Sequence, residues 1–186
     1  MVHFSGGCYP SSDVSAPRRS PWKTDPARAS LLARYAEVDA LLRDFTCDDT
    51  AECCQFAITG REPYPTAVEL SEVRHAIAAA GIAIAPPERE RERGGRTKRS
   101  LPLAAETGRC PLLGDDMRCR IYQSRPFGCR TFFCDRARGP GKMPRVEIQR
   151  ISRAIADLSS LHAPRDPHPR PLRNALEEMR QRGGGR

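Results

Sequence analysis

The chain has 186 residues, of which 39% are hydrophobic and 6% aromatic, and it carries a formal net charge of +8. This length is typical of one domain with a modest core. No segment approaches the roughly 20 consecutive apolar residues that cross a bilayer, so we expect no membrane-spanning part. The excess positive charge is concentrated in residues 1–23, 88–99 and 162–186. Because these segments look flexible, they disfavour a folded basic face that binds nucleic acid.

The N-terminal part of the sequence divides into an irregular segment and a helix. Residues 1–23 are rich in Ser, Pro and Gly and show no hydrophobic periodicity, so we predict a disordered arm. The next apolar residues recur at steps of three and four, which is typical of an amphipathic helix. We expect this helix to begin near Pro26 and to end just before Cys47, with its inner face formed by Leu31, Tyr35, Val38, Leu42 and Phe45.

A second helix is predicted after a loop. Residues 60–65 contain one glycine and two prolines, which interrupt regular structure. Thr66 and Glu69 then have the spacing of a capping box. Gly81 is a suitable residue for the C-terminal end of the helix. The inner face of this helix is predicted to consist of Leu70, Val73, Ile77 and Ala80.

The rest of the chain alternates between irregular segments and short helices. Residues 85–100 form a charged linker, and the cysteine-rich segment 108–134 is expected to contain turns and one brief helix after Pro126. A third helix is predicted at 146–161. A last short helix, which either docks on the domain or frays, carries Leu172, Leu176 and Met179.

These elements predict a mainly α fold with a loop-rich cysteine-cluster core, which is a small, metal-stapled single domain with flexible termini. The metal-binding domain is expected to span residues 24–161 and to contain the charged linker 85–100. The arm at 1–23 precedes it, and a Pro/Arg-rich tail at 162–186 follows it.

Seven of the eight cysteines fall in two blocks, while Cys8 lies in the predicted arm. Residues 1–30 lack the apolar stretch of a secretory signal, so we expect a cytoplasmic protein. In a reducing cytosol, clustered cysteines more often bind metal or perform redox chemistry than form disulfides. Packing as small hydrophobic residues is the plainer alternative, and it is less suited to two tight blocks. The blocks are Cys47, Cys53 and Cys54, then Cys110, Cys119, Cys129 and Cys134.

The spacing of the blocks favours one shared centre. Neither block has the paired CxxC spacing of a zinc ribbon, so a single centre would have to join both and staple the two halves of the chain. The irregular spacing and the absence of histidine ligands suit an all-thiolate iron–sulfur cluster, which we favour, while zinc remains the other option.

Arginine and proline residues accompany the second block. Positive charge beside a thiol favours the thiolate, and a centre with several thiolates accumulates negative charge that Arg125 and Arg130 can balance. Pro126 sets the turn before Cys129. Tyr122 either excludes water from the centre or belongs to the core.

Three segments of the sequence resemble a known family. "CDDTAECC" at 47–54, "GRCPLL" at 108–113 and "CRIYQSRPFGCR" at 119–130 are similar to the YkgJ-type cysteine-cluster family, also called CxxCxxCC. The departure is Thr50, which stands where the family pattern has its second cysteine. The resemblance covers roughly residues 47–134 and implies a zinc- or iron-chelating domain. Its matched positions are Cys47, Cys53, Cys54, Cys110, Leu112, Cys119, Ile121, Tyr122, Arg125, Pro126, Cys129 and Arg130.

Two functions from different classes follow. The favoured one is a metal-binding protein with a redox or accessory role, and the alternative is an interaction module with a purely structural zinc. A basic nucleic-acid-binding protein is the least favoured interpretation. A protein partner is left open, as is enzymatic activity, because no metal-independent catalytic arrangement is apparent. The predicted ligands are Cys47, Cys53, Cys54, Cys110, Cys119, Cys129 and Cys134, with Tyr122, Arg125, Pro126 and Arg130 around them.

Overall fold

A computed structural model describes residues 21–45, 51–84, 108–132, 139 and 142–183. Within these residues the protein is mainly helical, with isolated β-bridges instead of strands, which confirms the predicted fold class. None of the described helices has the length and apolar character needed to cross a membrane. The predictions for Cys8, Cys47, Thr50, Cys134 and the charged linker fall outside the described residues.

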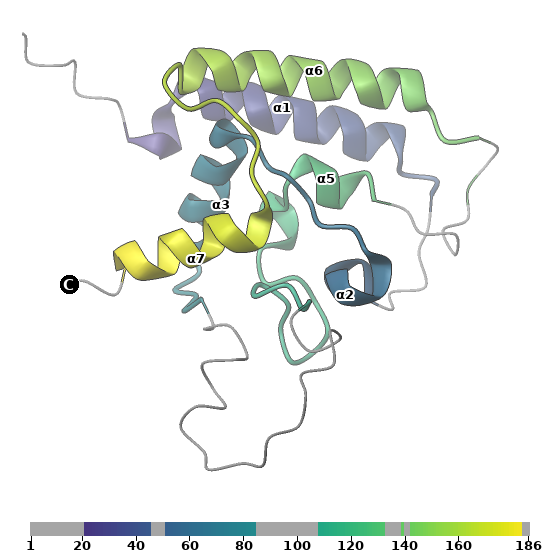
Figure 1. The fold of residues 1–186 in the computed structure, drawn as a ribbon. Helices are drawn as coiled ribbons and strands as arrows, with labels where there is room; N and C mark the ends of the chain where they lie inside the picture. Colours follow the sequence, from purple (N-terminus) through teal and green to yellow (C-terminus); the bar gives the residue numbers. More distant parts are fainter. Residues whose placement is uncertain (1–20, 46–50, 85–107, 133–138, 140–141, 184–186) are drawn as a thin grey trace, which may run out of the picture.

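Three long helices lie side by side and form what we call the helical lobe (Figure 1). They are α1 (Pro26–Leu41), α3 (Ala67–Ala79) and α6 (Arg145–His162). All three coincide with predicted helices, because their apolar residues repeat with the helical period. The buried cluster between these helices also includes Phe127, which comes from residues 108–132. Its members are Leu31, Tyr35, Val38, Leu42, Val68, Phe127, Ile151 and Ile155.

The ends of α1 are set by local interactions. The Asp25 side chain accepts a hydrogen bond from the Ala27 N–H at 2.8 Å, and Pro26 occupies the first turn, which is the favoured start of a helix. The helix ends at Leu41, earlier than the predicted end just before Cys47. The reason is a turn in which the Phe45 N–H donates to the Leu42 carbonyl at 2.9 Å, since a turn can produce the same three-residue spacing as a helix.

The predicted capping box is confirmed at the start of α3. There the Glu69 side chain accepts a hydrogen bond from the Thr66 N–H at 2.8 Å. The helix ends at Ala79, and Gly81 follows with a φ of 61°, a conformation that favours glycine. Ala80 was predicted to face inward, but it is exposed because the helix has already ended there.

Order begins before the predicted end of the N-terminal arm. The short helix η1 spans Trp22–Thr24, and the Trp22 indole N–H donates to the Glu72 carboxylate at 2.8 Å. A buried partner therefore fixes a segment whose composition alone suggested disorder.

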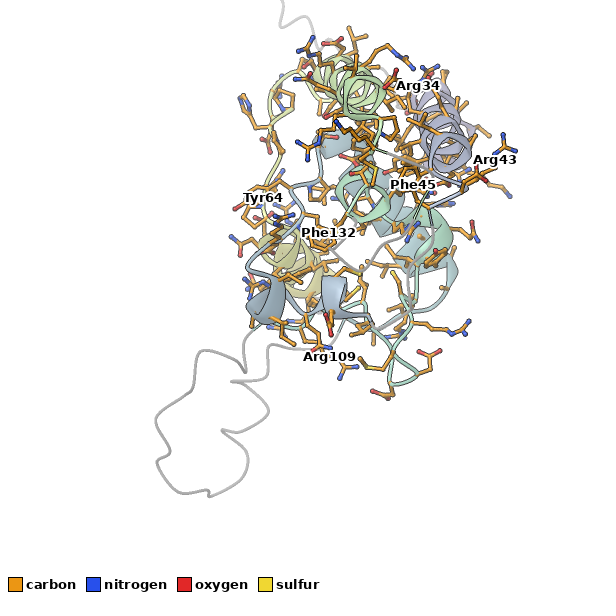
Figure 2. All side chains as sticks on the ribbon, turned by 90° about the vertical axis from the view of Figure 1, so that its right-hand side faces the viewer. Arg34, Arg43, Phe45, Tyr64, Arg109 and Phe132 are labelled. Carbon is orange, nitrogen blue, oxygen red and sulfur yellow. The ribbon has the colours of Figure 1, made fainter. Side chains whose placement is uncertain are left out.

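Residues 51–60 and 108–132 form what we call the cysteine lobe. Its helices are short: η2 (Glu52–Cys54), α2 (Phe56–Thr59), η4 (Tyr122–Ser124) and α5 (Phe127–Arg130). The last of these is the brief helix predicted after Pro126. Figure 2 shows Arg109 of this lobe at the opposite end of the molecule from Arg34 of α1.

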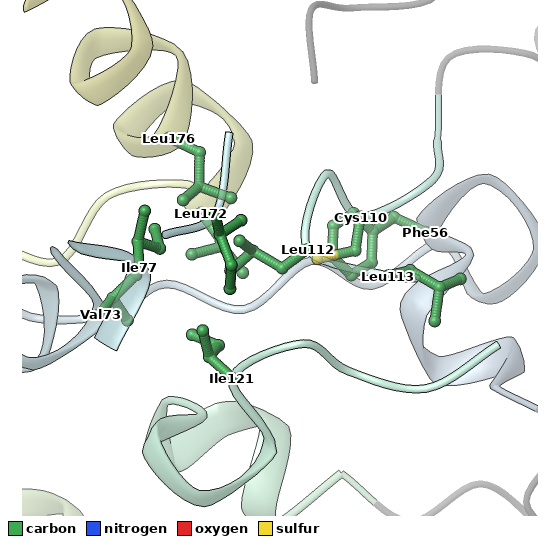
Figure 3. Close-up of a cluster of buried hydrophobic side chains, with 10 residues drawn as sticks. Phe56, Val73, Ile77, Cys110, Leu112, Leu113, Ile121, Leu172 and Leu176 are labelled. Atoms are coloured by element: carbon green, nitrogen blue, oxygen red, sulfur yellow. The ribbon is translucent and has the colours of Figure 1, made fainter. Parts of the chain in front are cut away.

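Helix α7 (Leu172–Gly183) docks on the domain, with Leu172 and Leu176 in a buried cluster shared with α3 and the cysteine lobe. The Leu172 N–H donates to the Pro63 carbonyl at 3.0 Å, and the Arg173 N–H donates to the Glu62 carboxylate at 2.7 Å. Figure 3 shows Leu172 and Leu176 turned toward the loop that carries Cys110 and Leu112. The buried residues of this second core are Phe56, Val73, Ile77, Ile82, Cys110, Leu112, Leu113, Ile121, Leu172 and Leu176.

Candidate metal centre

The two cysteine blocks are joined directly through their backbones. Gln55 and Arg109 form an antiparallel bridge, and the Cys110 N–H donates to the Cys54 carbonyl at 2.8 Å. Gly108 makes this approach feasible, because a Cβ on it would lie 2.3 Å from the side chain of Ala57. The blocks, separated by more than fifty residues in the sequence, therefore meet in the fold.

A tight turn then brings Cys119 back toward Cys110. Leu113 and Cys119 form a second bridge, and the Arg120 N–H donates to the Leu112 carbonyl at 2.9 Å. Met117 takes up a φ of 62° within the turn, which is uncommon for a residue other than glycine. The turn thus places the thiols of Cys110 and Cys119 near one another.

Cys129 reaches the site from α5. Pro126 precedes this helix, its side chain is fully buried, and its carbonyl accepts from the Cys129 N–H at 2.9 Å. The thiol of Cys129 interacts electrostatically with those of Cys53, Cys110 and Cys119. The predicted role of Pro126 as the residue that shapes this turn agrees with its position.

Five of the predicted ligands therefore converge, and all five are free thiols: Cys53, Cys54, Cys110, Cys119 and Cys129. Burial raises the pKa of the Cys110 thiol to about 12. Burial likewise raises the pKa values of Cys119 and Cys129, and neighbouring thiols add to the shifts. A cation bound among these thiols would stabilise their thiolate forms.

Cys53 and Cys54 differ although they are adjacent. The Cys54 thiol donates a hydrogen bond to Cys53, which lowers the pKa of Cys53 to about 6, with further help from the charge of Arg125. The same hydrogen bond and burial raise the pKa of Cys54 strongly. Cys53 is exposed, whereas Cys54 is half-buried against the apolar core, so Cys53 is the thiol of the pair that ionises more readily.

Arg125 supplies the positive charge nearest to the thiols. Its charge lowers the pKa values of Cys53, Cys119 and Cys129. The guanidinium lies over the Tyr122 ring, 4.2 Å from its centre, and its buried Nε has no hydrogen-bond partner among the described residues. A cation in this position is suited to an anionic group beside it.

Arg130 lies in a different environment. Its guanidinium packs over the Tyr35 ring at 4.1 Å and donates to the carbonyls of Arg125 and Gln123 and to Asp39. The donors of this buried side chain thus hold the loop before α5 to helix α1. The sequence pattern assigned the same role to both arginines, but their surroundings differ because one faces the thiols and the other faces the helical lobe.

The donor chemistry at the site fits a thiolate-bound metal group. Backbone N–H groups of Leu112 and Ile121 donate to the thiols of Cys110 and Cys119 and favour their thiolate forms. Within the described ranges, no three His, Cys, Asp or Glu side chains are arranged to hold one metal ion. The described thiols alone therefore do not form a closed shell, and Cys47 and Cys134 lie outside the described residues.

Other predicted features lie apart from the thiols or contribute through packing. Tyr122 is 54% exposed and supports Arg125. His162 lies against Trp22 and Ser71 in the helical lobe, so it supplies no base to the described cysteines.

The sequence analysis did not identify Glu69 and Glu72 as residues near the site. Glu69 and Glu72 on α3 accept hydrogen bonds from Phe127 and Ser124, which flank Arg125. Their signal was weak, because glutamates beside the apolar positions of a helix usually face solvent.

Comparison with known proteins gives one finding. The family model CxxCxxCC, described as "Putative zinc- or iron-chelating domain", matches residues 46–149. Neither the comparison with curated proteins nor that with solved structures gave a match. The matched range contains all seven predicted ligands and leaves Cys8 outside.

Proposed function

This chain belongs to the CxxCxxCC family, and we propose that its own centre is an iron–sulfur cluster held by thiolates and serving a redox or accessory role. The observation that supports this most directly is that five thiols from both cysteine blocks lie near one another, with the Arg125 guanidinium acting on three of them. Such a donor set is soft and anionic, which suits iron–sulfur clusters and tetrathiolate zinc.

The distribution of exposure is suited to a redox centre. Cys110 is buried, whereas Cys53 is exposed, so a group held between them would have one edge facing solvent. Solvent exposure is one of the factors that set the potential of a cluster, and an exposed edge allows electron exchange with a partner. Hydrogen bonds to sulfur and nearby charge tune the potential of a cluster, and the N–H groups of Leu112 and Ile121 and the Arg125 guanidinium supply these.

The residues of the chain have distinct tasks in this proposal. Cys110, Cys119 and Cys129 supply thiolates from the interior, and Arg125 balances part of their charge. An iron–sulfur cluster, when bound, supplies one-electron chemistry. Because the pKa of Cys110 lies at about 12 in the metal-free protein, this thiol must release a proton on ligation, which makes binding depend on pH.

A structural zinc in an interaction module is the second candidate. It is favoured by the position of the Cys110 sulfur within an apolar cluster, between Phe56 and Leu113 (Figure 3). A zinc there would staple the cysteine lobe to the core without any redox activity.

Anaerobic purification of the full chain followed by elemental analysis tests the proposal. We expect iron with acid-labile sulfide, and visible absorbance that bleaches on reduction. Colourless protein with about one zinc per chain would contradict the cluster and favour the second candidate. Protein that keeps its full fold without any metal would refute both.

Two serine variants sharpen this experiment. Cys119→Ser should lose metal and soluble yield, because an incomplete shell forfeits folding free energy. Cys8→Ser is the matched control, since Cys8 lies outside the family match, and it should retain the metal content of the parent. Metal loss in Cys8→Ser would contradict the assignment of the ligands.

A further inference from the structure

Helix α3 carries two carboxylates that are almost completely buried. Glu69 is 3% exposed and Glu72 is 1% exposed, although glutamate is rarely buried unless it is paired. The two residues are three positions apart, so their side chains share one face of the helix. That face is directed at residues 124–127, the segment that carries Arg125 and Pro126.

Glu72 holds the beginning of this segment. Its carboxylate accepts from the Ser124 hydroxyl at 2.9 Å, from the Arg28 Nε at 2.7 Å and from the Trp22 indole. Burial alone would raise its pKa, but these donors outweigh burial and keep the pKa below its ordinary value. Glu72 is therefore an ionised anchor, and the bond from Ser124 is one of several that satisfy it.

Glu69 holds the end of the same segment. Its carboxylate accepts from the Phe127 N–H at 2.7 Å, where α5 begins, and from the Tyr35 hydroxyl at 3.3 Å. At the centre of the segment, the Arg130 Nε donates to the Arg125 carbonyl at 2.9 Å. The segment is thus fixed at both ends and at its centre.

These contacts bear on the thiols because the local helices are too short to hold themselves. Helix η4 has three residues and α5 has four, well below the roughly 12 to 15 residues that a marginally stable isolated helix requires. The direction of the Arg125 guanidinium and the position of Cys129 therefore depend on tertiary contacts on either side of Pro126.

We propose that Glu69 and Glu72 are positioning residues for the metal centre, Glu72 acting through Ser124 on Arg125 and Glu69 acting through Phe127 on Cys129. This inference rests on the proposed function, since it concerns the same centre. It extends the site from the cysteine blocks to the buried face of α3.

The contact between Ser124 and Glu72 can be tested by a substitution that leaves Glu72 paired. Arg28 and Trp22 continue to pair Glu72 when the Ser124 hydroxyl is removed, so Ser124→Ala leaves no buried carboxylate without partners and should fold. Ser71→Ala is the matched control: Ser71 is a half-buried serine whose hydroxyl contacts Ala67 and His162, both in the helical lobe.

The experiment titrates metal-free full-length protein with Co²⁺ and follows the thiolate-to-metal absorption bands. Ser124→Ala should weaken Co²⁺ binding by up to about tenfold, since partners outside the ligand shell typically contribute 10–100-fold to affinity and Ser124 acts one residue further away. Ser124→Thr, which keeps a hydroxyl, should restore the parent affinity, and Ser71→Ala should match the parent.

A double-mutant cycle distinguishes action through Arg125 from a general loss of stability. In an Arg125→Gln background, Ser124→Ala should cause little further loss of Co²⁺ affinity, because the Ser124 contact acts through the position of the Arg125 charge, and that charge is already absent in this background. Full additivity of the two losses would overturn the inference, as would a Ser124→Ala protein that binds like the parent. A parent chain that binds no Co²⁺ would instead overturn the inference for a single metal ion, and it would leave the iron–sulfur cluster to the elemental analysis described above.

Discussion

Helices α1, α3 and α6 of the helical lobe have 16, 13 and 18 residues, whereas the helices of the cysteine lobe have three or four. A long helix forms most of its backbone hydrogen bonds internally and needs only an apolar face to pack. A lobe of short turns lacks that source of order. It needs contacts from elsewhere, which here come from α7, from the buried face of α3 and, in our proposal, from a metal group.

The two lobes also differ in how their charges are balanced. In the helical lobe, acidic and basic side chains pair with each other, as Arg28 does with Glu72 at 2.7 Å and Arg34 with Glu37 at 2.6 Å. In the cysteine lobe, Arg125 lies among thiols and its Nε has no hydrogen-bond partner within the described part of the chain. The difference agrees with our proposal of a thiolate-bound centre in the cysteine lobe, because Arg125 would then balance part of its negative charge.

Removal of the metal should produce the largest difference between the two lobes. Metal binding that is coupled to folding adds to the stability of the residues that hold the metal, so we expect chelation to weaken the protection of amides in residues 108–130 more than elsewhere. Amides of α1 and α6 should stay protected, because their cores are apolar. Hydrogen exchange read by mass spectrometry measures both at once. Equal loss of protection in both lobes would contradict the claim that only the cysteine lobe depends on the metal.

Core truncations should show the same division at a smaller scale. Ile151 is 0% exposed in the helical lobe and Leu112 is 1% exposed in the cysteine lobe. Replacement of either by alanine is expected to cost about 2–5 kcal/mol of unfolding free energy in the metal-bound protein. In metal-free protein, Ile151→Ala should keep this cost, whereas the cost of Leu112→Ala should be smaller. Denaturant unfolding of both forms provides the measurement, and equal costs in both forms would argue against metal-dependent order.

The smallest effect concerns two thiols within the cysteine lobe. The pKa of Cys53 is lowered to about 6, and that of Cys110 is raised to about 12. Metal-free protein treated with iodoacetamide near neutral pH should therefore be alkylated at Cys53 well before Cys110, as peptide mass spectrometry would show. Equal rates at the two residues would contradict the assigned environments.

The same shifts fix the direction in which pH changes stability. The raised pKa of Cys110 contributes stability below the ordinary thiol value of 9.0, and this contribution is lost as the pH rises toward about 12. The lowered pKa of Cys53 contributes stability above 9.0, and this is lost as the pH falls toward about 6. A thermal midpoint of metal-free protein that rises steadily above pH 9.0 would oppose the first of these signs.

The sequence by itself determined the local elements and the kind of site. The three long helices follow from the repeat of apolar residues, and the start of α3 follows from Thr66 and Glu69, because both signals act within one or two helical turns. The brief helix after Pro126 has a local cause as well, since proline fixes the backbone at its start. The cysteine blocks identified the family and the class of ligand without any knowledge of the fold.

The tertiary structure decided which of several residues of the same type in the sequence lie at the site. Helix α7 docks because Leu172 and Leu176 meet Leu112 and Ile121, and no pattern within residues 172–183 encodes that encounter. Arg125 faces the thiols, while Arg130 binds Asp39 and Tyr35, which precede it by more than ninety residues. Periodicity and capping are read over a few residues, whereas the burial and charge around a side chain depend on segments that only the fold brings together.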